Sequence, residues 1–266
     1  MIGAIFGDIA GSIYEFDNIK TKEFELFFRG CEFTDDTVMT VAVADALLRY
    51  EEICDVEDFK RTLAKVMREY GRRYPYAGYG GLFSWWLRSE DEGPYNSFGN
   101  GSAMRVAPVA WYARSLDEAL SLAKATAEIT HSHPEGICGA QVTAGAAYLA
   151  RTGASKEEIR AFICQYYDMD FTLDEIRPYY NFDETCSGTV PYAMQAFLES
   201  DSFEDAIRNG ISIGGDSDTL CAICGAVAEA YYGMTEAETD KALSYLDDTL
   251  TDVVAAWKAF VEKREQ

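Results

Sequence analysis

The sequence predicts an all-α fold, and three observations carry this prediction. Apolar residues recur at three- and four-residue spacing through most of the chain, which is the period of an amphipathic helix. No convincing run of alternating apolar and polar residues indicates a strand, and neither a GxGxxG motif nor a P-loop is present. With 266 residues and no segment that resembles an interdomain linker, the chain is expected to form a single compact, orthogonal multi-helix domain over residues 1–266.

Helices are expected where these apolar stripes occur. Alanine-rich segments are typical of closely packed interior helices, and they occupy residues 38–48, 119–127 and 139–150. Amphipathic segments present one apolar face to the core. Three such segments are expected. In chain order, the residues of their apolar faces are Phe59, Leu63, Val66, Met67 and Tyr70; Ile159, Phe162, Ile163 and Tyr166; and Leu243, Leu246, Leu250, Val253, Trp257 and Phe260. Pro191 is expected to open a further helix that begins near Val190.

Two regions depart from the helical pattern and are expected to be irregular. Residues 71–101 contain many of the glycines and the Trp85–Trp86 pair. A loop of this length is usually functional or disordered, and its aromatic content argues against disorder. Residues 168–189 form a second irregular connection, which is acidic and aromatic. We therefore expect residues 71–101 to take part in function.

The composition argues against several classes of partner. The formal net charge of −22 repels nucleic-acid backbones. Asp8 interrupts the apolar N-terminus, which lacks the basic lead of a signal peptide, and no later apolar run approaches the roughly 20 residues of a membrane span. Seven cysteines, an odd number, indicate reduced thiols in a cytoplasmic protein, and Cys221 and Cys224 are expected to pack in the core. We expect neither a membrane nor a nucleic-acid partner, and a monomer.

Two short acidic clusters stand directly before apolar helices. The first comprises Thr34, Asp35 and Asp36, and the second, which follows two glycines, comprises Asp216, Ser217, Asp218 and Thr219. A single Asp, Ser or Thr at a helix start is explained as an N-cap, and either cluster taken alone is more often a cap than a set of metal ligands. Each cluster nevertheless carries more carboxylates and hydroxyls than one cap requires, and the pattern occurs twice.

The repetition of this pattern favours a metal site over two separate caps. Four carboxylates in a small volume cannot all stay ionised unless protons or cations compensate their charge. Ligands that are all oxygen favour hard ions such as Mg²⁺, Mn²⁺ or Ca²⁺ over zinc. Four carboxylates with two threonine hydroxyls suit a pair of such ions about 4 Å apart.

Five motifs resemble those of the ADP-ribosylglycohydrolase family, which includes the dinitrogenase-reductase-activating hydrolases and the arginine- and serine-directed ADP-ribosylhydrolases. In the family's order they are "GDIAGSIYEF" (7–16), "FTDDTVM" (33–39), "SFGNGSAMR" (97–105), "THSHPEG" (130–136) and "IGGDSDT" (213–219). The resemblance extends over nearly the whole chain. It implies an all-α fold with a dinuclear magnesium site in a cleft.

The resemblance also implies a role for individual residues. Two Mg²⁺ ions, with Mn²⁺ as an alternative, would be held by Thr34, Asp35, Asp36, Asp216, Asp218 and Thr219. Asp35 or Asp36 would take a proton from a water or hold the metal that acidifies it, and Glu15 would gate or assist at the scissile bond. We expect Asp8 to fix the loop beneath the site.

ADP-ribose, or an ADP-ribosylated protein, is the partner that the resemblance implies. The residues expected to contact it are Gly80, Gly81, Ser97, Phe98, Gly99, Asn100, Gly101 and His131. Phe98 stands where many families carry a tyrosine, so a stacking role is retained and a hydroxyl contact is lost. Arg105 would supply a cation for the diphosphate or form an ion pair at the edge of the core.

The expected activity is metal-dependent hydrolysis of the glycosidic bond between ADP-ribose and a protein side chain, with arginine as the first choice of acceptor and serine as the second. "THSHPEG" is more similar to the arginine-directed branch and "GSIYE" to the serine-directed one. Three alternatives stay open. They are an ADP-ribose-binding module without turnover, a hydrolase of a free ribosyl compound such as O-acetyl-ADP-ribose, and a calcium-stabilised structural protein.

Overall fold

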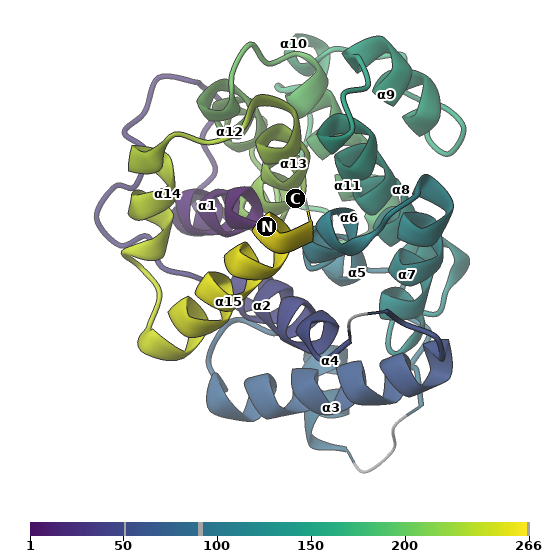
Figure 1. The fold of residues 1–266 in the computed structure, drawn as a ribbon. Helices are drawn as coiled ribbons and strands as arrows, with labels where there is room; N and C mark the ends of the chain where they lie inside the picture. The colour runs from purple at the N-terminus through teal and green to yellow at the C-terminus, as the bar shows by residue number, and fades with distance from the viewer. Residues whose placement is uncertain (51, 90–92, 265–266) are drawn as a thin grey trace.

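The computed structural model describes residues 1–50, 52–89 and 93–264. Over these ranges the chain is helical and contains no regular strand, so the all-α prediction is confirmed (Figure 1). The helices are α1 (Ile2–Gly11), a 3₁₀ turn (Ser12–Tyr14), α2 (Asp35–Leu48), α3 (Val56–Arg73), α4 (Gly81–Arg88), α5 (Gly101–Met104), α6 (Ala107–Tyr112), α7 (Leu116–Glu128), α8 (Pro134–Arg151), α9 (Lys156–Ile163), α10 (Leu173–Ile176), α11 (Cys186–Leu198), α12 (Phe203–Ser212), α13 (Ser217–Tyr232), α14 (Glu236–Leu243) and α15 (Asp248–Arg264). None of the helices in this part of the chain is long and apolar enough to cross a membrane.

Helix α13 lies at the centre of the fold. Every residue from Ser217 to Ala228 is buried, and the helix packs against α1, α8, α11 and α12. Figure 1 shows these helices grouped around it, with α2 and α3 extending the bundle on one side. Most of the buried apolar side chains belong to one connected cluster, as expected of a single core. Cys221 and Cys224 lie fully buried within it as free thiols, as we predicted.

Helices α1 and α13 approach so closely that their contact requires glycine. A Cβ atom on Gly7 would lie 2.0 Å from the carbonyl oxygen of Cys221, and one on Gly11 would lie 2.4 Å from that of Ser217. Such overlaps involve backbone atoms, so rotation of a side chain cannot relieve them. The close contact places the end of α1, and Glu15 just beyond it, beside the start of α13.

Replacing Gly7 by alanine is expected to destabilise the fold. Gly7→Ala forces the two helices apart, and overpacking of this kind costs about 3 kcal/mol. Urea denaturation would measure the change in the free energy of unfolding. Gly81→Ala is the matched control, because a Cβ at Gly81 meets no atom within 4 Å. If Gly7→Ala had the same free energy of unfolding as Gly81→Ala, the close approach of α1 and α13 described here would be contradicted.

Two predicted helix boundaries are wrong. Helix α11 begins at Cys186 rather than near Val190, because the Thr185 hydroxyl caps it by accepting from the Gly188 N–H at 2.9 Å. Pro191 therefore lies inside the helix, where it donates no hydrogen bond. Helix α9 ends at Ile163, so Tyr166 lies beyond it and is 40% exposed.

The C-terminal stripe belongs to two helices rather than one. Helix α14 ends at Leu243 and α15 starts at Asp248, which leaves Leu246 in the connection. Leu250 and Trp257 are buried as expected, and Val253 is partly buried against the core. Val254, which we did not predict, is buried as well.

Residues 71–101 are partly helical, which corrects the prediction of a long loop. Helix α3 extends to Arg73, and α4 occupies Gly81–Arg88. The Phe83 and Trp86 rings stack with their centroids 5.6 Å apart, and both side chains are buried. The flanking glycines obscure this short amphipathic helix in the sequence. The part of the predicted loop at residues 90–92 lies outside the described residues.

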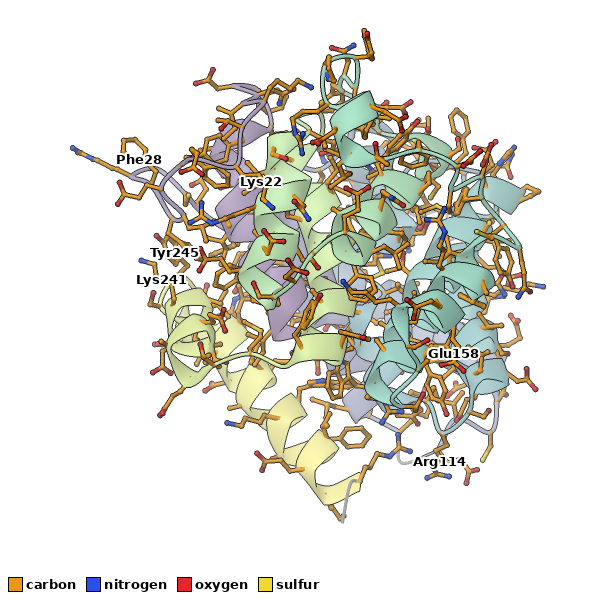
Figure 2. All side chains as sticks on the ribbon, turned by 90° about the horizontal axis from the view of Figure 1, so that it is seen from above. Lys22, Phe28, Arg114, Glu158, Lys241 and Tyr245 are labelled. Atoms are coloured by element: carbon orange, nitrogen blue, oxygen red, sulfur yellow. The ribbon has the colours of Figure 1, made fainter. Side chains whose placement is uncertain are left out.

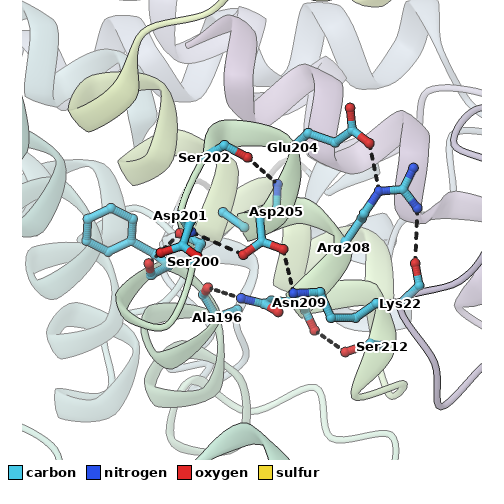
Figure 3. Close-up of polar contacts among 12 residues, drawn as sticks. Lys22, Ala196, Ser200, Asp201, Ser202, Glu204, Asp205, Arg208, Asn209 and Ser212 are labelled. Atoms are coloured by element: carbon cyan, nitrogen blue, oxygen red, sulfur yellow. Dashed lines mark hydrogen bonds and ion pairs between the residues drawn. The ribbon is translucent and has the colours of Figure 1, made fainter.

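The irregular segment that follows Glu15 is anchored to α12 (Figure 3). Lys22 forms an ion pair with Asp205. The Arg208 guanidinium donates to the carbonyl oxygen of Lys22 at 3.1 Å. It also donates to the carbonyl oxygen of Phe24 at 2.8 Å. These contacts hold the segment against the body of the protein.

The same segment has a second anchor near its far end. Figure 2 shows the segment reaching Phe28 at the edge of the molecule, with Tyr245 and Lys241 on the same side. The Phe27 ring lies 5.5 Å from that of Tyr245 and 5.1 Å from the Lys241 ammonium. Aromatic and cation–π contacts therefore connect the segment to the end of α14.

Candidate active site

One cavity of about 550 Å³ brings together all the site residues that we predicted from the sequence. It is bounded by the starts of α2 and α13, the segment leading into α4, and the chain at 95–101 and 182–185. The predicted residues that line it are Glu15, Thr34, Asp35, Asp36, Gly80, Gly81, Ser97, Phe98, Gly99, Asn100, Gly101, His131, Asp216, Asp218 and Thr219. Their roles as ligands or catalysts stay predictions.

Asp8 holds the first acidic turn in place from below. Its buried carboxylate accepts hydrogen bonds from the Thr34 N–H at 3.0 Å and the Thr34 hydroxyl at 2.6 Å. It also accepts from the Thr37 N–H at 3.1 Å and from the Thr37 hydroxyl. Thr34 in turn caps α2 by accepting from the Asp36 N–H at 3.3 Å. Asp8 therefore fixes the loop, as expected, and the cap of α2 does not need the Asp36 carboxylate.

A left-handed turn presents the second acidic cluster. Residues 214–215, both glycine, have φ values of 70° and 80°, a region that favours glycine. Asp216 stands at the N-cap of α13, but its side chain makes no capping bond and instead accepts from the Asn100 amide at 2.7 Å. The Thr219 hydroxyl donates to Asp36 Oδ1 at 3.3 Å and so joins the two clusters. Helix capping therefore does not account for these carboxylates.

The arrangement fits a divalent cation. Asp36 Oδ2 is buried without a hydrogen-bond partner among the described residues. Glu15, Asp216 and Asp218 each offer a carboxylate oxygen, and these oxygens lie within 4.8 Å of one another. Every atom that could coordinate the ion is an oxygen, the ligand atom that hard divalent ions prefer. Glu15, which we predicted to act at the scissile bond, belongs to this group, whereas Asp35 and Asp36 do not.

Burial raises the pKa values of the carboxyl groups in both clusters. Desolvation, reinforced by neighbouring carboxylates, raises the pKa of Asp35 to about 8 and that of Glu15 to about 7. The same two causes hold the pKa values of Asp36 and Asp218 well above the ordinary range. Without a cation the cluster therefore holds protons near neutral pH, and a divalent ion would displace them.

The opposite wall of the cavity includes residues that the sequence did not reveal. The Asn100 N–H donates to the Glu184 carbonyl oxygen at 2.8 Å, and Gly99 pairs with Thr185 in an isolated bridge. Phe182, Glu184 and Thr185 consequently line the cavity. The acidic and aromatic character of residues 168–189 was the only signal for them, and it named no individual residue.

Asn18 is a second residue that sequence reasoning missed. Its amide nitrogen donates to the carbonyl oxygens of Glu15 at 3.0 Å and Gly215 at 2.9 Å, and its oxygen accepts from the Gly215 N–H at 2.8 Å. Asn18 therefore links the backbone of Glu15 to the turn that carries the second acidic cluster. An asparagine in a polar loop carries no sequence signal for such a long-range contact.

Within the described part of the chain, Arg105 does not form the ion pair that was one of the two roles considered for it, and its role as a cation for the diphosphate stays a prediction. It is buried, lines the cavity and forms no ion pair among the described residues. Its guanidinium donates to the Thr126 carbonyl oxygen at 3.1 Å and to the Thr130 hydroxyl at 2.7 Å. The positive charge thus sits at the C-terminal end of α7, where the helix dipole stabilises it.

The fold and the site define a class: an all-helical protein with an oxygen-rich, acidic cavity that can hold divalent metal at the starts of two helices. The family model for ADP-ribosylglycohydrolase matches residues 1–265, and this protein belongs to that family. The family resemblance predicted from the motifs is therefore confirmed, and with it the assignment to a family of hydrolases.

Curated relatives agree with this assignment, and one solved structure shares the fold. ADP-ribosylhydrolase ARH3 of Mus musculus is 27% identical, with 96% of this chain and 88% of that protein covered. ADP-ribosylarginine hydrolase Tri1 of Pseudomonas putida (strain GB-1) is also 27% identical, with 88% of this chain and 70% of that protein covered. A structure described as an ADP-ribosylglycohydrolase-related protein complex shares the fold, with a TM-score of 0.61, 24% identity, and 96% of this chain and 95% of that chain covered.

Proposed function

We propose that this protein is a metal-dependent ADP-ribosylhydrolase that removes mono-ADP-ribose from protein side chains, arginine first and serine second. The observation that carries the proposal is the convergence of Glu15, Asp36, Asp216 and Asp218 on one cavity that also exposes the glycine-rich turn at 97–101. The carboxylates suit cations, and the turn and the remaining volume suit a nucleotide-sized ligand. The names of the relatives support the same chemistry.

The first acidic turn and the start of α13 would hold the metal ions. The proposed ligands of two Mg²⁺ ions, or of Mn²⁺ in their place, are Thr34, Asp35, Asp36, Asp216, Asp218 and Thr219, together with Glu15 from the carboxylate group described above. When bound, such ions fix vicinal ribose hydroxyls and lower the pKa of a coordinated water.

The carboxylates would serve the chemistry of the scissile bond. Asp35 or Asp36 accepts a proton from the attacking water, which adds to the anomeric carbon of the distal ribose. Positive charge grows on the sugar as the bond to the acceptor breaks, and the surrounding carboxylates stabilise it. Glu15, which lines the same cavity, would contact the leaving group. The proton taken from the water passes to the leaving group as it departs, and free ADP-ribose is released.

Aromatic and acidic side chains at the cavity mouth support arginine as the first acceptor. The Phe16 and Phe182 rings stack with their centroids 6.3 Å apart, and their side chains are 86% and 47% exposed. Phe182 lines the cavity together with Glu15 and Glu184. Aromatic faces beside carboxylates recognise a planar guanidinium by cation–π contact and charge-assisted hydrogen bonds.

Peptides with ADP-ribose linked to arginine or serine would test the proposal directly. We expect free ADP-ribose to be released in Mg²⁺ and not in EDTA, and faster from the arginine-linked peptide. If neither peptide released ADP-ribose while ADP-ribose still bound tightly, the proposed deribosylation would be wrong and a binding module, or a hydrolase of O-acetyl-ADP-ribose, would replace it. A large thermal shift with metal but none with ADP-ribose would indicate a calcium-stabilised structural protein instead.

A further inference from the structure

A chain of hydrogen bonds connects Arg105 and His131, two residues that line the cavity. The Arg105 guanidinium donates to the Thr130 hydroxyl oxygen at 2.7 Å, and this oxygen lies 2.8 Å from His131 Nδ1. All three residues are buried, with exposed fractions of 1% for Arg105, 0% for Thr130 and 5% for His131.

The direction of each hydrogen bond in this chain follows from which groups can accept. A guanidinium has no acceptor and does not lose its proton in proteins, so Thr130 must accept from Arg105. The hydroxyl then has one proton left to donate, and His131 Nδ1 is the acceptor within reach. The reverse arrangement, with Nδ1–H donating, would leave the buried Thr130 proton without a partner, which costs free energy.

The remaining ring nitrogen of His131 faces the cavity wall. A Cβ atom on Gly101 would lie 3.1 Å from His131 Nε2, and one on Gly99 would lie 3.7 Å away. Because glycine has no Cβ atom, no side chain from these two positions crowds this nitrogen. Nε2 makes no hydrogen bond to any of the described residues, and both His131 and the 99–101 turn line the cavity. Burial and the nearby Arg105 charge lower the pKa of His131 well below its ordinary value, so the ring is neutral.

We propose that Thr130 is a positioning residue that holds His131 in the Nε2–H tautomer, so that His131 donates a hydrogen bond to an oxygen of the bound ADP-ribose. The inference rests on the proposed function for the identity of the ligand, whereas the tautomer itself follows from the protein alone. A neutral donor suits this position because Arg105 already places one buried positive charge nearby. A protonated His131 would bury a second positive charge, which costs free energy.

The nitrogen spectrum of the histidine rings tests the tautomer without reference to turnover. The chain has only two histidines, so a long-range ¹H–¹⁵N correlation spectrum of the full-length protein in Mg²⁺ contains two ring systems. A His133→Asn variant identifies which of them belongs to His131. We expect His131 to show an unprotonated Nδ1 and a protonated Nε2, with the Nε2–H signal shifting when ADP-ribose is added.

Two variants of Thr130 separate positioning from packing. Thr130→Val keeps the shape but removes the hydroxyl, and it should mix or reverse the tautomer and weaken ADP-ribose binding about tenfold in calorimetry. Thr130→Ser keeps the hydroxyl and should retain both the spectrum and the affinity. An Nδ1–H tautomer in the wild-type protein, or a Thr130→Val spectrum identical to that of the wild type, would overturn the inference. Loss of turnover with the expected spectra would count against the proposed function alone.

Discussion

Asp36→Asn is expected to lower kcat/KM for release of ADP-ribose by about 10³-fold. Asp36 has one carboxylate oxygen that accepts from Thr219 and another that is buried without a hydrogen-bond partner in the described part of the chain. The amide of asparagine keeps the size of the side chain but cannot supply a second anionic oxygen. Metal-assisted stabilisation of the transition state is worth several kcal/mol, and each 1.36 kcal/mol corresponds to a factor of ten.

Asp117→Asn provides the matched control for this prediction. Asp117 also lies in the first turn of a helix, but it is exposed and far in the sequence from both clusters. Its substitution should leave kcat/KM within a factor of two of wild type, as is usual for an exposed residue away from the chemistry. If the two variants released ADP-ribose at the same rate, Asp36 would have no part in the reaction.

Removing divalent metal at pH 8 is expected to lower the melting temperature by roughly 5–10 °C. A ligand present at 100 times its Kd stabilises a folded protein by about 2.7 kcal/mol, and for a chain of this size each kcal/mol shifts the melting temperature by roughly 2–4 °C. At pH 5 the shift should be smaller, because protons on Asp35 and Glu15 then compete with the cation.

The metal-free protein should itself lose stability as the pH rises. Burial raises the pKa of Asp35 from 3.8 to about 8 and that of Glu15 from 4.5 to about 7. Below about pH 4 both residues are protonated in the folded and unfolded chains and do not affect the free energy of unfolding. Between about pH 4 and pH 8 the unfolded chain releases protons that the folded chain retains, so the free energy of unfolding falls across this window.

Scanning calorimetry with Mg²⁺ or EDTA at pH 5 and pH 8 measures both the effect of metal removal on the melting temperature and the loss of stability of the metal-free protein with rising pH. Potassium chloride at equal ionic strength is the control, because a chain with a net charge of −22 is also stabilised by simple screening. A melting temperature that did not respond to EDTA at pH 8, or a metal-free protein that gained stability between pH 5 and pH 8, would contradict the acidic cluster described above.

The helical architecture could be predicted from the sequence because apolar periodicity is a local property. The stripe from Phe59 to Tyr70 lies in α3, and the alanine-rich segments lie in α2, α7 and α8. The predicted helix boundaries were wrong where two local sequence signals favour different structures. Thr185 caps a helix earlier than Pro191 would, and glycines around α4 hid its apolar face. Caps depend on backbone geometry that residue types alone do not specify.

The candidate site could be predicted to the extent that its residues occur in short motifs. The two acidic clusters and the turn at 97–101 have recognisable local patterns, and the structure brings them to one cavity. Asn18 and Glu184 act through contacts with segments distant in the sequence, and Thr130 accepts from the distant Arg105. Such contacts depend on the tertiary packing of the helices. No local pattern contains that information.

The binding of Mn²⁺ to the purified protein tests most directly whether the two acidic clusters form one metal site. Equilibrium dialysis would count the ions, and electron paramagnetic resonance would report whether they lie close enough for their spins to couple. Two Mn²⁺ ions per chain with coupled spins, displaced by Mg²⁺ and lost in Asp36→Asn, are the predicted result, because paired catalytic ions lie about 4 Å apart. A protein that bound no Mn²⁺, or only a single uncoupled ion unaffected by Asp36→Asn, would contradict it.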